Sequence, residues 1–157
     1  PQWHQRIKLE ILNLAKYVNF LKSELHRSWF RLKPDTHPRF NYCIWRGYLQ
    51  IPKNPEIRFY MVILLNSEYP NVIPRCLLEE KIINYCGKIY LKNTWKDPIT
   101  NKTFVMICHD HMAELSRVWE NTLGIVHFFI REVWFWFAAQ YNHILENWKK
   151  QHGKVPD

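Results

Sequence analysis

The chain has 157 residues, of which 47% are hydrophobic and 16% aromatic, and it carries a formal net charge of +8. This length suits one hydrophobic core, and the apolar content excludes intrinsic disorder. We therefore expect a single domain over residues 1–157. The basic residues are scattered and form no dense tract. We rank a basic nucleic-acid-binding protein last among the function hypotheses and expect no nucleic-acid partner.

The most apolar window, VWFWFAA at 133–139, is bracketed by polar residues. It is much shorter than the ~20 residues that cross a bilayer, so we predict a buried helix, no membrane partner and a cytoplasmic protein.

The four cysteines are spread along the chain, at Cys43, Cys76, Cys86 and Cys108. No C-x-x-C pair or other zinc-ligand spacing occurs among them. We interpret them as free thiols, most of them buried, and expect no metal and no cofactor.

From Trp3 to about Leu32 the apolar residues recur every three or four positions, which predicts one long amphipathic helix. They are Ile7, Ile11, Leu14, Val18, Leu21, Leu25, Trp29 and Leu32. The segment KPDTHP at 33–38 ends this helix, because each proline restricts the preceding residue to extended conformations.

Two runs rich in aromatic and branched residues, 40–51 and 57–65, predict a β-hairpin, and RCLLEEKII at 75–83 predicts a third strand. Residues 84–107 predict an ordered loop region in which only KIYL (88–91) resembles a strand. Such a long connection is more often functional than idle. From Asn121, a candidate N-cap, apolar spacing predicts one or two helices to Trp148. The fold class is α+β, with a meander of antiparallel strands.

The segment ICHDH at 107–111 raises three hypotheses for Cys108. Residue type alone favours a buried thiol. A metal site with His109 and His111 is disfavoured, because ligands this close in sequence rarely point at one ion. A papain-like nucleophile needs a helix N-terminus at the cysteine, and here the next predicted helix begins more than ten residues later.

Several short motifs occur in the order found in one family. They are Trp45 in the first predicted strand, IRFYMVILLNSEYPNVIP with Tyr69-Pro70 and Pro74, MIC at 106–108, and Trp119 eleven residues after the cysteine. Over nearly its whole length the chain resembles the ubiquitin-conjugating enzymes. The resemblance implies an N-terminal helix, a four-stranded antiparallel meander, a cysteine-bearing loop and C-terminal helices.

The resemblance also implies that Cys108 accepts an acyl group as a thioester and passes it to an amine. The family's oxyanion donor, the Asn of a His-Pro-Asn motif, is missing here, and KDPITNKT (96–103) takes its place. Asn101 either donates to the oxyanion from a shifted loop or caps a turn. His109 and His111 are candidates to orient the acceptor amine or relay its proton.

The segments REVWFWFAAQY and ENWKKQHGK resemble divergent bacterial members found with anti-phage (CBASS-type) or ubiquitin-like conjugation operons. The expected partner is a protein with a flexible C-terminal tail, either a cyclic-oligonucleotide synthase or a ubiquitin-like protein. An activating enzyme is a further candidate. The resemblance implies that the first helix, with Lys8, Arg27 and Arg31, docks either this enzyme or the body of the donor protein. The main alternative is an inactive variant of the same fold that only binds a partner. We favour the active enzyme, because the nucleophile is kept.

Overall fold

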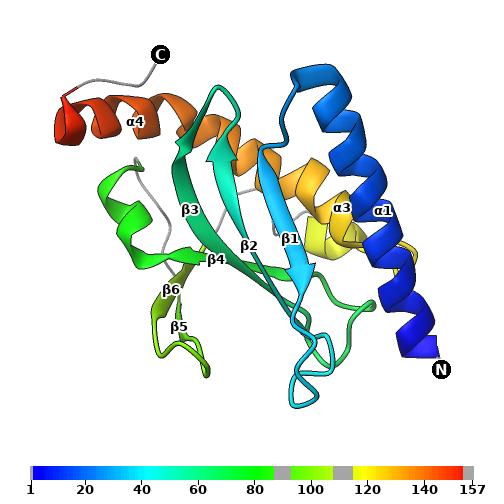
Figure 1. Cartoon of the computed structure of the whole chain (residues 1–157). Coiled ribbons are helices and arrows are strands. Elements are labelled where there is room, and N and C mark those ends of the chain that lie inside the picture. Colours follow the sequence, from blue (N-terminus) through cyan, green and yellow to red (C-terminus); the bar gives the residue numbers. More distant parts are fainter. Residues whose placement is uncertain (1, 87–92, 108–114, 154–157) are drawn as a thin grey trace.

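The computed structural model describes residues 2–86, 93–107 and 115–153. The fold is α+β: the strands follow α1 in the chain, interrupted by one 3-10 helix, and the longer C-terminal helical run comes after them (Figure 1). The sheet consists of β1 (Phe30–Pro34), β2 (Ile44–Ile51), β3 (Asn54–Leu64), β4 (Arg75–Glu79), β5 (Thr94–Lys96) and β6 (Thr103–Met106). The helical elements are α1 (Gln2–Leu25), the 3-10 helix η1 (Glu80–Asn84), α3 (Ile125–Phe128), the π-helix η2 (Phe129–Val133) and α4 (Trp134–His152). None of the helices in these ranges is long and apolar enough to cross a membrane.

The sheet has six strands in the order β1-β2-β3-β4-β6-β5, and every neighbouring pair is antiparallel. The predicted hairpin is confirmed as β2 and β3, and the predicted third strand begins correctly at Arg75. The four-stranded meander of the sequence analysis is therefore too small by two strands. The predicted third strand also ends early, because η1 follows Glu79.

The first helix is shorter than predicted. It ends at Leu25, His26 adopts a left-handed conformation with φ 63°, and β1 begins at Phe30. Trp29 and Leu32 continued the helical spacing by coincidence, because their positions also suit a short strand. Arg27 and Arg31 consequently lie beyond α1, so that only Lys8 of the predicted dock is on the helix.

The segment 84–107 was predicted as a loop, yet it contains β5 and β6. Two strands of 3 and 4 residues are too short to show an alternating pattern. The alternation in β6 is further obscured because apolar residues pack on both faces of it. The KIYL stretch lies outside the described residues.

The main core lies between one face of the sheet and the helices, which all pack on that side (Figure 1). Trp45 of β2 is 0% exposed and Tyr69 is 4% exposed, and both side chains are part of this core. A second, small cluster occupies the outer face of the sheet. It consists of Ile44, Val62, Leu77 and Phe104.

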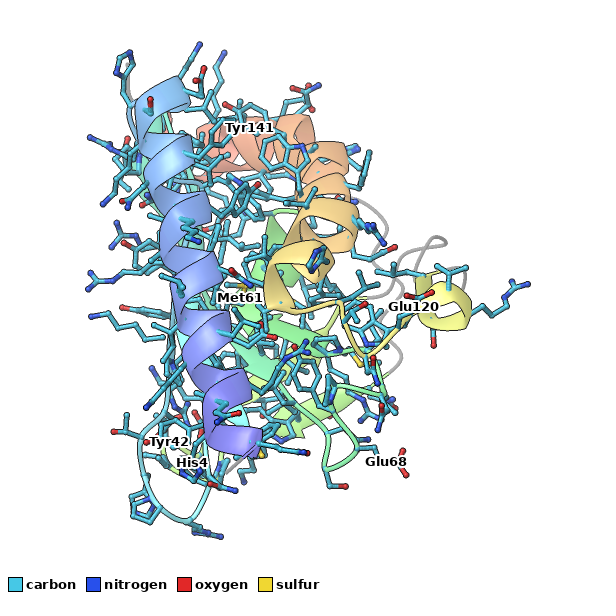
Figure 2. All side chains as sticks on the ribbon, turned by 90° about the vertical axis from the view of Figure 1, so that its right-hand side faces the viewer. His4, Tyr42, Met61, Glu68, Glu120 and Tyr141 are labelled. Atoms are coloured by element: carbon cyan, nitrogen blue, oxygen red, sulfur yellow. The ribbon has the colours of Figure 1, made fainter. Side chains whose placement is uncertain are left out.

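The C-terminal helical run is confirmed, although its N-cap is Gly124 and not the predicted Asn121, and its first residue is Ile125. Helices α3 and α4 are joined through the π-helical turn η2. Figure 2 shows α1 beside α3, and it places His4 of α1 next to Tyr42, with ring centroids 6.1 Å apart.

Candidate active site

Strand β6 leads directly to the predicted nucleophile. Ile107, the residue before Cys108, is 1% exposed, and its N–H donates to the carbonyl of Cys76 at 3.1 Å. One residue earlier, the N–H of Met106 donates to the carbonyl of Asn93. The backbone is therefore fixed up to the position preceding the cysteine. Cys108, His109 and His111 themselves lie outside the described residues, and their predicted roles stay predictions.

The chain is anchored again from Leu115 onward. Leu115 is 6% exposed within the main core, and residues 115–118 are helical. Trp119 donates from its indole Nε1 to the carbonyl of Pro70 at 2.8 Å. Trp119 and the Tyr69-Pro70 pair, which are far apart in sequence, are thus brought together.

A buried carboxylate links this region to the first helix. Glu10 is 2% exposed and accepts hydrogen bonds from Tyr69 Oη at 2.7 Å, Arg6 Nε at 2.8 Å and the backbone N–H of Ile125 at 2.8 Å. Burial, together with the negative charge of Glu10, raises the pKa of Tyr69 well above its usual range. The tyrosine therefore stays neutral and acts as a hydrogen-bond donor.

Sequence analysis missed Glu10 and Arg6. A signal was present, because Glu10 stands three residues after Ile7 and four before Leu14, on the buried face of the helix. Gly124 leaves room for its carboxylate, since a Cβ there would lie 2.5 Å from Glu10 Oε1.

Asn101 lies at the tip of the β5–β6 hairpin. It is exposed, its φ is 62°, and its N–H donates to the carbonyl of Asp97 at 2.9 Å. Because extended residues advance about 3.3 Å each, the strand separates Asn101 from Ile107 by roughly 20 Å. These contacts are those of a turn residue, and within the described ranges the Asn101 carboxamide makes no hydrogen bond.

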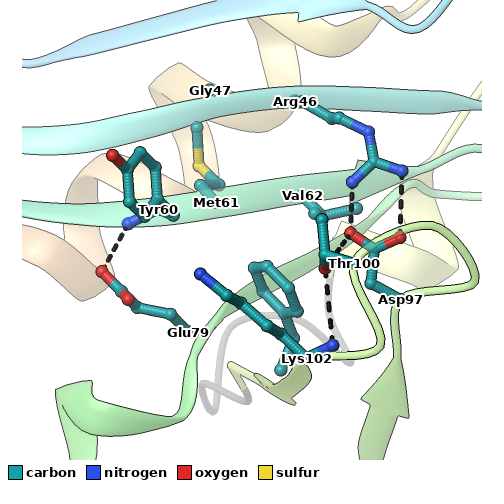
Figure 3. Close-up of a pocket in the computed structure, with 10 residues that line it drawn as sticks. Arg46, Gly47, Tyr60, Met61, Val62, Glu79, Asp97, Thr100 and Lys102 are labelled. Atoms are coloured by element: carbon teal, nitrogen blue, oxygen red, sulfur yellow. Dashed lines mark hydrogen bonds and ion pairs between the residues drawn. The ribbon is translucent and has the colours of Figure 1, made fainter.

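Asp97, which precedes Pro98 in KDPITNKT, is a structural anchor. Its carboxylate pairs with both terminal nitrogens of Arg46 on β2, and it accepts from the N–H of Ile99 and from Thr100 Oγ1 (Figure 3). Burial alone would raise the pKa of Asp97, but these hydrogen bonds hold it below its usual range. The pair borders an outer-face cavity of about 270 Å³ that Tyr60 and Lys102 also line.

The three described cysteines are poor nucleophiles. Cys76 and Cys86 are buried, and Cys43 is half-buried. Burial raises the pKa of Cys76 beyond its normal range, that of Cys86 to about 12, and that of Cys43 by a smaller amount. All three thiols are free. Within the described ranges no three His, Cys, Asp or Glu side chains cluster as metal ligands would.

Comparison with known proteins adds little to this geometry. No protein-family model and no curated protein sequence matches the chain. Among solved structures, the chain is similar to a crystal structure of a provisionally assigned ubiquitin-conjugating enzyme from Plasmodium yoelii. The two share 17% sequence identity, the alignment covers 92% of this chain and 86% of the other, and the TM-score is 0.42. At this level of similarity no function follows from the match.

Proposed function

We propose that this protein is a ubiquitin-conjugating-enzyme-like acyl transferase whose nucleophile is Cys108. The observation that supports the proposal is the firm anchoring of Ile107, the residue that precedes Cys108 in the sequence. Cys76 and Cys86 are buried, and partial burial raises the pKa of Cys43. Cys108 is therefore the candidate, because a nucleophilic thiol must be accessible and able to ionise.

The proposed reaction has two steps. In the first, the Cys108 thiol loses its proton and the thiolate attacks the carbonyl of a donor thioester. A new sulfur–carbon bond forms, the old one breaks, and the donor's sulfur leaves as a thiolate that takes up the proton. In the second, an amine attacks the Cys108 thioester, an amide forms, and the cysteine returns as a thiol. His109 and His111 are candidates to take the proton of the amine.

The donor in this proposal is a protein with a flexible C-terminal tail. An extended end can enter a shallow, loop-lined site, and a terminal glycine would crowd the reacting carbonyl least. A cyclic-oligonucleotide synthase or a ubiquitin-like protein would supply such a tail, and an anti-phage operon is the proposed setting.

The second candidate function is a binding module of the same fold without catalysis. It is favoured by the hairpin, where Asp97 is committed to Arg46 and Asn101 to a turn. The His-Pro-Asn motif of the resembled family is replaced here by KDPITNKT. Both candidates bind the donor, and they differ in whether a covalent adduct forms.

The test is adduct formation with the products of neighbouring genes. The protein is incubated with each candidate donor, ATP and any activating enzyme, and the products are separated with and without reducing agent and mapped by mass spectrometry. We expect an adduct on Cys108 that thiols release. Cys108→Ser should yield an ester that resists thiols, and Cys108→Ala should yield no adduct.

Cys43→Ala and Cys86→Ala are the matched controls, and both should form the adduct at the wild-type level. An adduct that maps to another residue, or that survives Cys108→Ala, would overturn the assignment of the nucleophile. Donor binding without any adduct in the wild type would establish the non-catalytic module instead.

A further inference from the structure

A basic cavity opens where the C-terminal end of α1 meets the first three strands. It has a volume of about 590 Å³, and its lining contains four cationic side chains and no acidic one. The four are Lys22, Arg27, Arg31 and Arg58. Lys22 lies in the last turn of α1, and the three arginines come from the following connection, β1 and β3. Within the described part of the chain, none of them forms an ion pair with a carboxylate.

One of these cations is held in place by buried groups. Arg58 Nη2 donates to Gln50 Oε1 at 2.8 Å, and its guanidinium carbon lies 3.8 Å from the centroid of the Tyr48 ring. Gln50 is 5% exposed and is itself fixed by a hydrogen bond from Nε2 to the carbonyl of Ser28 at 2.8 Å. Arg58 is therefore pre-organised, which lowers the entropy lost when a ligand binds.

The positive charge of the cavity favours an anionic ligand. Four like charges repel one another, and the partial negative charge at the end of α1 offsets only the nearest of them, Lys22 and Arg27. Arginine guanidinium groups donate paired hydrogen bonds that match phosphate oxygens. A ligand with several linked phosphates would meet all four cations at once.

We propose that this cavity binds a small polyphosphate, such as the phosphate chain of a nucleoside triphosphate. Its volume is in the range of small-molecule sites. The cations meet in one cavity and do not follow a long groove, which disfavours a nucleic-acid strand. Of the two aromatic rings in the lining, Tyr48 is covered by Arg58 and Phe30 is 2% exposed, so neither offers a face to a base. The phosphates are recognised and the base is not.

Binding of a polyphosphate here goes beyond acyl transfer and requires no group of the Cys108 loop. It is tested by isothermal titration calorimetry of the wild-type protein with sodium tripolyphosphate, ATP and adenosine, at low salt and without divalent metal. We expect tripolyphosphate and ATP to bind with dissociation constants that agree within about threefold, and adenosine not to bind. Affinity should fall as salt is raised, because the contacts are ionic.

Arg58→Gln and Arg31→Gln test the cavity, and each should raise the dissociation constant for tripolyphosphate about tenfold, as expected for a lost charge-assisted hydrogen bond. Both residues are exposed, so melting temperatures should stay near the wild-type value. Arg75→Gln is the matched control, because it removes one exposed positive charge from β4, outside the cavity. Its dissociation constant should change less than about twofold.

Three results would overturn the proposal. The first is an equal loss of affinity in Arg75→Gln, which would show that net charge alone attracts the anion. The second is the absence of tripolyphosphate binding to the wild type. The third is tighter binding of oligothymidylate than of tripolyphosphate. If the cavity variants abolish oligothymidylate binding, the ligand of the cavity is a nucleic-acid strand. If they do not, oligothymidylate binds to a different surface of the protein.

Discussion

Arg46 on β2 and Asp97 after β5 form a two-pronged ion pair, although β3, β4 and β6 lie between their strands in the sheet. In a flat sheet, the four strand spacings between β2 and β5 would separate them by roughly 19 Å. The sheet therefore curls until the β5–β6 hairpin reaches the outer face of β2 (Figure 3). The ion pair closes this curl, and Asp35 supports Arg46 from the other side at 3.0 Å.

Asp97→Asn should weaken the fold and change how its stability depends on pH. The pKa of Asp97 is lowered in the folded protein. The stability it contributes is therefore fully present above its usual pKa of 3.8 and is lost as pH falls through the lower folded value. Urea unfolding should show a loss of about 1–2 kcal/mol at neutral pH and a smaller loss near pH 3.

The control for this effect is Glu56→Gln, which removes an exposed carboxylate on β3. It should leave both the stability and its pH dependence near wild type. If the free energy of unfolding had the same pH dependence in Asp97→Asn as in wild type, the ion pair would not stabilise the fold as argued above.

Variants of Asn101 separate its two predicted roles. Because φ is 62°, Asn101→Gly should be as stable as wild type, whereas Asn101→Ala should lose about 1 kcal/mol. Both should still form the Cys108 adduct at rates near the wild-type rate, measured by gel under single-turnover conditions. Loss of the adduct in a folded Asn101→Gly protein would instead identify the carboxamide as the oxyanion donor.

Glu10→Gln and Gly124→Ala should destabilise the protein through one shared contact. The first removes the charge that three donors face, and the second forces the carboxylate away from the start of α3. Each should cost roughly 2–4 kcal/mol in urea unfolding. The double variant should lose clearly less stability than the sum of the losses in the two single variants, because both substitutions disrupt the same contact. Fully additive losses would show that the two positions act independently.

Trp45→Ala should destabilise the protein more than Trp95→Ala does. Its side chain is 0% exposed in the main core, so its removal should cost about 3–5 kcal/mol, seen as a fall in the urea midpoint. Trp95→Ala removes a half-buried indole from the outer cluster and should cost distinctly less. Equal losses would mean that the outer cluster contributes as much to stability as the main core.

The long periodic elements could be predicted from sequence, and the short ones could not. The β2–β3 hairpin and the C-terminal helices follow from extended runs of one periodicity. Strand β1 was hidden because Trp29 and Leu32 fit both a helix and a strand. Strands β5 and β6 were hidden because their stability comes from pairing with each other and from β4, which no local pattern reveals.

The residues of the candidate site could likewise be predicted from sequence only in part. Cys108 is predicted from a motif and stays a prediction, and Trp119 was singled out in the same way. The contact between Trp119 and Pro70 was not predicted, because it joins residues 49 positions apart. Glu10 was missed because a charged residue in an amphipathic helix is usually assigned to solvent. The role of Asp97 could not be predicted either, since its partner Arg46 is 51 residues away.

Gly47 offers a way to find relatives of this chain by sequence. A Cβ at this position would lie 1.7 Å from the carbonyl oxygen of Arg31, so any side chain would push β1 away from β2. Selection that keeps this strand pair must therefore keep glycine here, whatever happens to the segment that contains Cys108. Homologues that lack this cysteine should still have glycine two residues after the buried tryptophan of β2.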